Sequence, residues 1–163
     1  MKNLFLSLLI LFSVTLSAQT KRYKTEEFSI EYPENWKLNT EGILGTAFII
    51  MSPVEEGDKF GESFNLIIQD LPTYDITLDD YVKISEKQIV DAFGENSILE
   101  SKTENGKHKI VYTGKQKDME MLYAQIYIIK NNKAYVLTFT CLPADYEQLK
   151  ALADKTLESF MVF

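Results

Sequence analysis

The chain has 163 residues and a mass of 18.8 kDa, with 45% hydrophobic, 25% charged and 12% aromatic residues. This composition is typical of a soluble globular domain with one core, and it excludes a disordered tail, a collagen-like fibre and a multidomain assembly. The formal net charge of −7 argues against a protein that binds nucleic acid by general electrostatic attraction.

Residues 1–18 have the layout of a secretory signal peptide. A positively charged start precedes an apolar run from Leu4 to Leu16 and a small residue, Ala18. The run is shorter than the roughly 20 apolar residues that anchor a chain in a bilayer. No Cys lies near the expected cleavage site after Ala18, so a lipoprotein anchor is not indicated. We expect a periplasmic or secreted protein with one domain, residues 19–163, and no membrane span.

Three early segments with alternating or clustered apolar residues predict β-strands. They are Phe28–Tyr32, Thr46–Met51 and Phe64–Leu71. A proline follows closely after each segment, where it would end the strand. The second and third strands are joined by an acidic, glycine-bearing loop over residues 55–62.

The apolar spacing then changes to the helical period and predicts a helix over residues 78–93. Thr77 and Asp80 have the spacing of a capping box at its start, and Gly94 is a typical C-terminal stop. The same apolar spacing predicts a second helix from Ala144 to Phe160.

Two β-hairpins are predicted between the helices, with type I′ turns at Asn105-Gly106 and Asn131-Asn132, because these residues tolerate a left-handed backbone. If Lys130 faces Lys133 across the second turn, the pairs on one face are all apolar. These pairs are Ile128 with Tyr135, Ile126 with Leu137, Ala124 with Phe139, and Leu122 with Cys141. This register directs Cys141 toward the core.

The opposite face of that hairpin carries aromatic and polar side chains together. Tyr127 pairs with Val136 there, and Tyr123 and Gln125 pair with threonines. We predict a binding surface made of Tyr123, Gln125, Tyr127 and Thr138, because amphipathic rings give contact area at low entropic cost. The alternative is that one of the two helices covers this face.

The order of elements, three strands, a helix, four strands and a helix, predicts an α+β fold with an antiparallel sheet packed by helices. Several segments along the chain resemble the PsbP-like family. They are Phe28-x-Ile30-x-Tyr32-Pro33-x-x-Trp36, Leu66-Ile67-Ile68 leading into Leu78-Asp79-Asp80-Tyr81, the Asn105-Gly106 hairpin, Lys133–Leu137 and Ser159-Phe160.

The PsbP-like family includes the extrinsic PsbP subunit of photosystem II, DcrB-like envelope proteins, chaperones of type VI effectors and a Ran-binding nuclear import factor. The resemblance implies an α/β/α sandwich with a central antiparallel sheet of about six or seven strands and two main helices. It also implies a non-enzymatic binding or assembly module.

Catalytic patterns are sparse. The segment 61–65, Gly-Glu-Ser-Phe-Asn, lacks the second glycine of a nucleophile elbow. The single His108 is interpreted as an exposed hairpin residue, with a general base or metal ligand as the alternative. Cys141 is interpreted as a small apolar side chain buried in a strand, with a nucleophile, a redox thiol or an intermolecular disulfide as alternatives. One His and one Cys are too few for a zinc site of His and Cys ligands.

Two charged segments have a structural and a functional interpretation. The acidic loop is interpreted as solvated, with a calcium-type site of Glu55, Glu56, Asp58 and Glu62 as the alternative. The lysines of the first hairpin are expected to protect an edge strand from aggregation, with contact to an acidic partner or a lipid headgroup as the alternative. These lysines are Lys102, Lys107, Lys109, Lys115 and Lys117.

The sequence therefore predicts an exported, non-enzymatic binding or accessory protein that recognises a protein or peptide partner in the cell envelope and uses no cofactor. The alternative is a periplasmic carrier of a small apolar ligand or a cation. An enzyme ranks third, because no nucleophile, base and orienting group can be assembled from these residues. The oligomeric state is left open.

Overall fold

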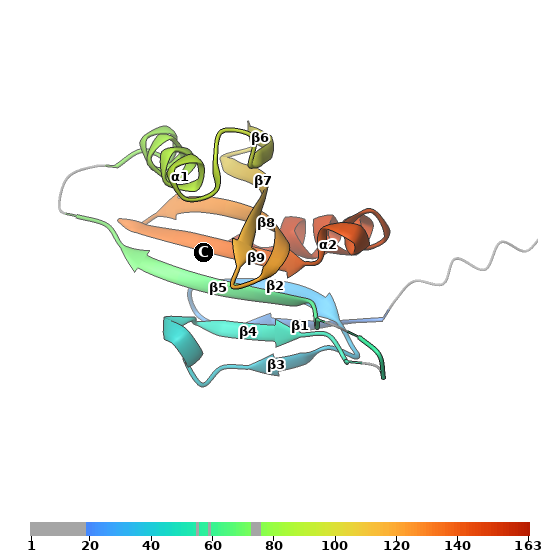
Figure 1. The fold of residues 1–163 in the computed structure, drawn as a ribbon. Helices are drawn as coiled ribbons and strands as arrows, with labels where there is room; N and C mark the ends of the chain where they lie inside the picture. Colours follow the sequence, from blue (N-terminus) through green and yellow to red (C-terminus); the bar gives the residue numbers. More distant parts are fainter. Residues whose placement is uncertain (1–18, 55, 59, 73–75) are drawn as a thin grey trace, which may run out of the picture.

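A computed structural model describes residues 19–163 except 55, 59 and 73–75 (Figure 1). The predicted signal peptide therefore lies outside the described residues. The elements in chain order are β1 Thr20–Lys24, β2 Phe28–Pro33, β3 Lys37–Asn39, the 3₁₀ turn η1 Ile43–Gly45, β4 Phe48–Met51, β5 Ser63–Asp70, α1 Leu78–Phe93, β6 Ile98–Glu104, β7 Lys107–Gln116, β8 Met119–Lys130, β9 Lys133–Cys141, the 3₁₀ turn η2 Pro143–Asp145, α2 Tyr146–Ser159 and β10 Met161–Val162.

The strands form two antiparallel sheets. The larger sheet has seven strands in the order β3-β4-β5-β9-β8-β7-β6, and the smaller has the order β1-β2-β10. Helix α1 packs over β6, β7 and β8, whereas α2 packs against β2, β8 and β9 (Figure 1). The predicted α+β fold, with an antiparallel sheet of about six or seven strands and two main helices, is thus confirmed, and the sheet has seven strands.

The smaller sheet is the main departure from the sequence prediction. The strand predicted at Phe28–Tyr32 is present as β2, but it pairs with β1 and β10 and not with the larger sheet. Periodicity missed both partners: β1 is almost wholly exposed, and β10 has only two residues. Neither strand therefore carries a hydrophobic pattern long enough to detect.

Local sequence signals set the ends of α1. The Thr77 hydroxyl accepts a hydrogen bond from the Asp80 backbone N–H, and the Asp80 carboxylate accepts one from the Thr77 N–H. This capping box and Gly94 confirm the helix predicted over 78–93. The second predicted helix is also present, as α2, but its first turn is the 3₁₀ turn η2.

Both predicted hairpin turns are confirmed by backbone angles in the left-handed region. The φ angles are 52° at Asn105, 73° at Gly106, 52° at Asn131 and 58° at Asn132. Every cross-strand pair predicted for β8 and β9 is present. Cys141 accordingly faces the core and is 0% exposed.

The main core lies between the two sheets and α2. Its largest buried side chains include Phe48, Phe64, Phe139 and Phe160, and the rings of Phe64 and Phe139 lie with centroids 4.8 Å apart. A second, smaller cluster lies under α1 and is made of Val82, Ile89, Ile110, Tyr112, Tyr127 and Val136. The two faces of the larger sheet therefore carry different side chains: one face is apolar and the other is partly polar.

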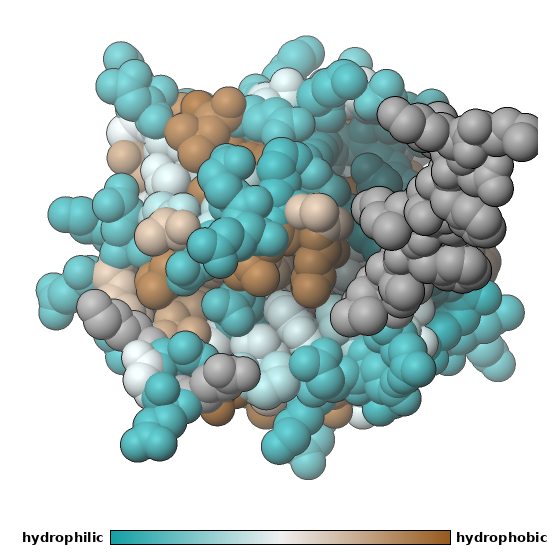
Figure 2. Space-filling view, turned by 90° about the vertical axis from the view of Figure 1, so that its right-hand side faces the viewer, coloured by the Kyte–Doolittle hydropathy of each residue, from teal (hydrophilic) through white to brown (hydrophobic). Residues whose placement is uncertain are grey.

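The surface on the α2 side of the molecule is mixed. Figure 2 shows hydrophilic side chains projecting around the edge of this face, with hydrophobic side chains gathered between them. The seam between α2 and the smaller sheet contributes a hollow of about 260 Å³, lined in part by Pro33, Ala151 and Leu152.

Replacing Phe139 by Ala tests the position of the main core. We expect Phe139→Ala to lower the free energy of unfolding by about 3–5 kcal/mol, because the ring is fully buried and packs against the ring of Phe64. Urea denaturation of residues 19–163 measures the loss. The matched control is Phe163→Ala, which removes a ring that is 45% exposed. Equal losses for the two variants would contradict the assigned core.

Candidate functional site

A pocket lies between α1 and the part of the larger sheet that α1 does not cover. We call it the α1-face pocket; its volume is about 300 Å³. Its walls come from β5, α1, β7, β8 and β9. The residues that line it are Ile67, Gln69, Tyr81, Ser85, Gln88, Ile89, Phe93, Tyr112, Gln125, Tyr127 and Val136.

Aromatic rings build one side of the α1-face pocket. Tyr112 stacks between Tyr123 and Phe93, with ring centroids 5.0 Å and 6.0 Å away. Tyr81 of α1 meets Tyr127 of β8 edge to face at 5.4 Å. These pair geometries are the favourable ones for aromatic side chains, so the rings hold one another in place.

Gly114 lets Phe93 approach the sheet. A Cβ at position 114 would lie 2.7 Å from the Phe93 ring, which is closer than van der Waals contact allows. The absence of a side chain at this point of β7 therefore allows the ring at the C-terminal end of α1 to reach Tyr112.

Hydrogen bonds orient the amide side chains of the pocket. The Tyr127 hydroxyl donates to Gln125 Oε1 at 2.7 Å, and Gln125 Nε2 donates to Thr138 Oγ1 at 3.0 Å. The Tyr81 hydroxyl donates to Gln69 Oε1 at 2.7 Å. Two amides are thus fixed with their oxygens facing tyrosine hydroxyls.

The α1-face pocket carries no charged side chain among its lining residues. Burial raises the pKa of Tyr112 to about 12 and also raises the pKa of Tyr127. Both hydroxyls are therefore neutral at physiological pH. The walls combine apolar rings with uncharged hydrogen-bonding groups.

The structure brings the four predicted binding residues together around this pocket. Gln125 and Tyr127 line it, Thr138 holds the Gln125 amide, and Tyr123 stacks on Tyr112 beside it. Tyr127 and Thr138 lie deep, with 2% and 6% exposure, whereas Tyr123 and Gln125 are half-buried. Helix α1 therefore covers part of the face that the sequence predicted for binding.

Several pocket residues were missed by the sequence prediction. Tyr81, Ser85 and Gln88 project from one stripe of α1, and Gln69 and Tyr112 come from β5 and β7. The spacing of the three helix residues was a usable signal, because positions i, i+4 and i+7 share a helix face. The contribution of the two strands depends on tertiary pairing.

The prediction that His108 is exposed is wrong. In the register of β7 with its neighbours, the His108 ring points toward α1 and is 2% exposed. Its Nδ1 lies 2.8 Å from Thr103 Oγ1 and its Nε2 lies 3.3 Å from Ser101 Oγ. The Ser101 hydroxyl in turn donates to a Glu86 carboxylate oxygen on α1, and the imidazole stacks on Tyr127. His108 therefore helps to fasten α1 to the edge of the sheet.

Protonation of His108 should weaken the fold. Burial lowers the pKa of His108 below its ordinary value, although Glu86 and Asp79 oppose this effect. The unfolded chain therefore binds a proton more readily than the folded chain, and stability is lost as pH falls from about 6.5 toward the folded pKa. We expect His108→Asn to flatten this part of the stability profile, measured by urea denaturation between neutral and mildly acidic pH. An unchanged slope would contradict the assignment.

The lysines of the first hairpin do not form one patch. Lys102 lies on the edge strand β6, as edge protection requires, but Lys107 and Lys109 lie on the second strand, β7. Lys115 and Lys117 are at the opposite end of that hairpin strand and are exposed. The prediction of a common edge-protecting role is therefore wrong for Lys107 and Lys109.

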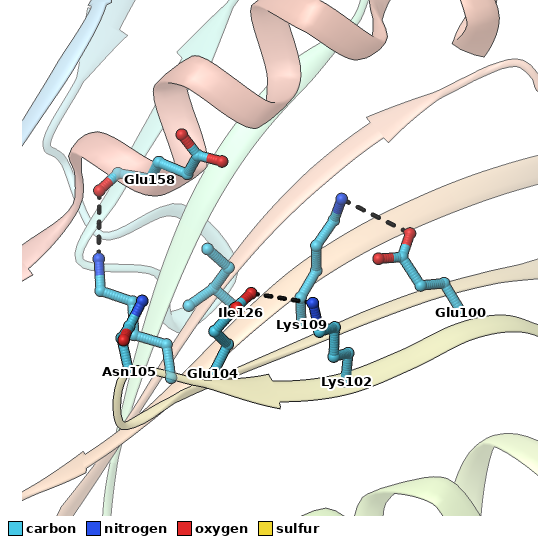
Figure 3. Close-up of a pocket in the computed structure, with 8 residues that line it drawn as sticks. Glu100, Lys102, Glu104, Asn105, Lys109, Ile126 and Glu158 are labelled. Carbon is cyan, nitrogen blue, oxygen red and sulfur yellow. Dashed lines mark hydrogen bonds and ion pairs between the residues drawn. The ribbon is translucent and has the colours of Figure 1, made fainter.

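Lys107 and Lys109 face α2 across a charged groove of about 500 Å³. Figure 3 shows Lys109 beside Glu100, and Lys102 beside Glu104. Lys109 Nζ also lies 2.8 Å from Asp154 Oδ1 of α2. The Lys109–Asp154 ion pair therefore connects the hairpin to α2.

Lys107 provides a C-terminal cap for α2 from a distant strand. Its Nζ donates to the backbone carbonyls of Glu158 and Phe160, at 3.1 and 2.7 Å. A positive charge at this position satisfies free carbonyls and opposes the helix dipole.

Removing the ammonium group tests this cap. We expect Lys107→Met to lower the free energy of unfolding by about 1–2 kcal/mol, because the carbonyls lose a charged donor. Lys115→Met, at an exposed position of the same strand, is the control and should change stability by less than about 0.5 kcal/mol. Thermal or urea unfolding measures both variants, and a neutral Lys107→Met variant would rule out the cap.

The remaining sequence candidates lie away from the α1-face pocket. Glu55 of the acidic loop is outside the described residues, and in the described part of the chain no group of three or more His, Cys, Asp or Glu side chains could hold a metal ion. Cys141 is buried as predicted, and burial raises the pKa of its thiol to about 12. None of the helices in the described ranges is long and apolar enough to cross a membrane.

Comparison with known proteins identifies the fold. The chain matches no protein-family model and no curated protein sequence. Among solved structures, it is similar to the cyanobacterial PsbP, CyanoP, of Synechocystis sp. PCC 6803, with a TM-score of 0.60, 19% identity, and coverage of 90% of this chain and 94% of CyanoP.

Two further structures from other organisms have the same architecture. The Ran-binding protein Mog1p of Saccharomyces cerevisiae has a TM-score of 0.61 at 12% identity, with 90% of this chain and 96% of Mog1p covered. LpqN of Mycobacterium tuberculosis, described as involved in cell envelope biogenesis, has a TM-score of 0.59 at 12% identity, with 88% and 90% covered. The chain thus has the fold that the PsbP-like resemblance implied, at sequence identities that define the fold alone.

Proposed function

We propose that this protein is a non-enzymatic binding protein that recognises a protein or peptide partner through the α1-face pocket and its rim. One observation carries the proposal: the pocket combines stacked aromatic rings with oriented amides and no charged side chain. Aromatic rings supply rigid contact area, and placed amides supply directional hydrogen bonds, which are the two components of a recognition surface.

The chemistry of the pocket favours binding over turnover. General acid–base catalysis works best with a group whose pKa lies near the operating pH. Burial raises the pKa values of Tyr81, Tyr112 and Tyr127. The hydroxyls of Tyr81 and Tyr127 already donate to neighbouring amides, and glutamine amides do not titrate. His108 is directed to Ser101 and Thr103 under α1.

The location and the fold relatives are consistent with a binding role in the cell envelope. Residues 1–18 have the pattern of a signal peptide, so we place the mature domain, residues 19–163, outside the cytosol. Two proteins of this fold are described as a Ran-binding protein and as a participant in cell envelope biogenesis. These roles belong to those proteins, and they support the fold as a scaffold for partner recognition.

The second candidate is a carrier of a small apolar ligand in the same pocket. A volume of about 300 Å³ is at the lower end of the range for small-molecule sites. Native mass spectrometry of protein purified from its own envelope fraction separates the two functions. A discrete adduct lost on denaturation would favour the carrier, and a clean mass or a complex with another polypeptide would favour the partner-binding protein.

Site-specific photocrosslinking tests the proposed surface. A photoreactive phenylalanine analogue placed at Gln88, which is exposed on α1 at the pocket, should crosslink to a defined protein or peptide partner in the native envelope. The same analogue at Gln148, which is exposed on α2, is the matched control and should not. Crosslinks of equal yield at both positions, or only at Gln148, would refute recognition through the α1-face pocket.

A further inference from the structure

The absence of charge in the α1-face pocket limits what it can hold. A charged group enters a low-dielectric site favourably only when an opposite charge or several hydrogen bonds replace its hydration. The pocket has no lining residue that supplies an opposite charge, in a chain that is 25% charged. The part of a ligand that enters the pocket is therefore uncharged.

The hydrogen-bond inventory shows which polar groups a ligand must supply. Gln69 Oε1 and Gln125 Oε1 each already accept a tyrosine hydroxyl. One N–H of the Gln125 amide donates to Thr138, and its second N–H has no partner among the described residues. Both N–H groups of the Gln69 amide also have no partner there. Gln88 adds a third amide at the rim. Gln69 and Gln125 together keep three uncommitted N–H groups and one lone pair on each oxygen, so a ligand must supply acceptors to satisfy them.

Peptide carbonyls match this inventory better than sugar hydroxyls. Each sugar hydroxyl donates as well as accepts, and one of the two lone pairs on each of the Gln69 and Gln125 amide oxygens is already occupied by a tyrosine hydroxyl. A backbone carbonyl only accepts. In an extended segment, the C=O and the N–H of one residue point to the same side, and the next residue points to the other side. The pocket amides can therefore donate to such a carbonyl, and the free lone pair of an amide oxygen can accept from the accompanying N–H.

The apolar walls determine the side chain that accompanies those carbonyls. Ile67, Ile89 and Val136 line the pocket together with the rings of Phe93 and Tyr112. An apolar or aromatic side chain would be desolvated against these groups, and a ring could extend the Phe93–Tyr112–Tyr123 stack.

We propose that the α1-face pocket binds an extended, uncharged peptide segment, with an apolar or aromatic anchor residue in the pocket and its backbone carbonyls accepting hydrogen bonds from the Gln69 and Gln88 amides. This inference rests on the proposed function and specifies the chemistry of its partner. Binding of this kind depends little on salt, because no charge pair forms.

A peptide library provides the test. Phage-displayed random peptides are selected on immobilised residues 19–163, and synthetic copies of the selected peptides are measured by fluorescence anisotropy at low and high salt. We expect one position to be enriched in apolar or aromatic residues and the affinity to be nearly independent of salt. Replacement of that anchor by Asp or Lys should weaken binding roughly tenfold or more, because an unpaired charge would be desolvated.

Variants of the amides locate the peptide. Gln69→Met and Gln88→Met keep the length of the side chain and remove its donors, and each should weaken the selected peptides by roughly three- to tenfold. Gln148→Met on α2 is the control and should leave affinity unchanged. Both pocket positions are exposed, so the variants should fold; circular dichroism checks this.

The outcomes separate this inference from the proposed function. Selected peptides that require a charged anchor, or that bind Gln69→Met and Gln88→Met as tightly as the wild type, overturn the inference while leaving a peptide-binding protein. A crosslinked partner at Gln88 together with an empty peptide selection overturns the inference in favour of a folded protein surface. Binding of an N-acetylglucosamine oligomer or a fatty acid, with no peptide selected and no crosslinked polypeptide, overturns both proposals.

Discussion

The width of the larger sheet, compared with that of a helix, determines where the α1-face pocket forms. Seven strands spaced about 4.8 Å apart give a surface of about 30 Å, whereas one helix with its side chains covers about 10–12 Å. On the opposite face, α2 and the smaller sheet cover this width together. On the α1 face a single helix lies over β6, β7 and β8, and its border with β9 and β5 is left as a pocket.

This arrangement explains why the two faces differ in chemistry. The main core face is lined by fully buried apolar side chains such as Phe64, Leu137 and Phe139. The α1 face alternates rings with Gln, Thr and Ser residues, which can remain partly hydrated at the border of the helix. A wholly apolar surface left uncovered would promote aggregation, whereas an amphipathic one can remain in contact with water.

Contacts on the side of α1 away from the pocket fix the position of the helix, and so of the pocket wall that it forms. Helix α1 is tied to the edge strand through Glu86 and Ser101, and His108 lies beneath it against Tyr127. Because Tyr127 also lines the α1-face pocket, the cluster under α1 and the pocket share one aromatic side chain. On the α2 side, Lys107 and Lys109 of the β6–β7 hairpin bind the C-terminal end of α2 and Asp154 of the same helix. The β6–β7 hairpin therefore holds both helices.

Local sequence signals predicted much of this fold. The parts that depend on contacts between residues far apart in the sequence could not be predicted. The capping box at Thr77, the turn at Asn131-Asn132 and the alternation along β8 and β9 each act over a few residues, and each was confirmed. The pocket required β5, α1 and β7 to meet, which no local pattern contains. His108 was misassigned because its closeness to a turn suggested exposure, whereas the strand register directs its ring under α1.

The contact between Phe93 and Gly114 has an evolutionary consequence. A Cβ at position 114 would occupy the space of the Phe93 ring, so the two positions should vary together among homologous chains. A larger residue at 114 should be accepted only where the residue at 93 has become small.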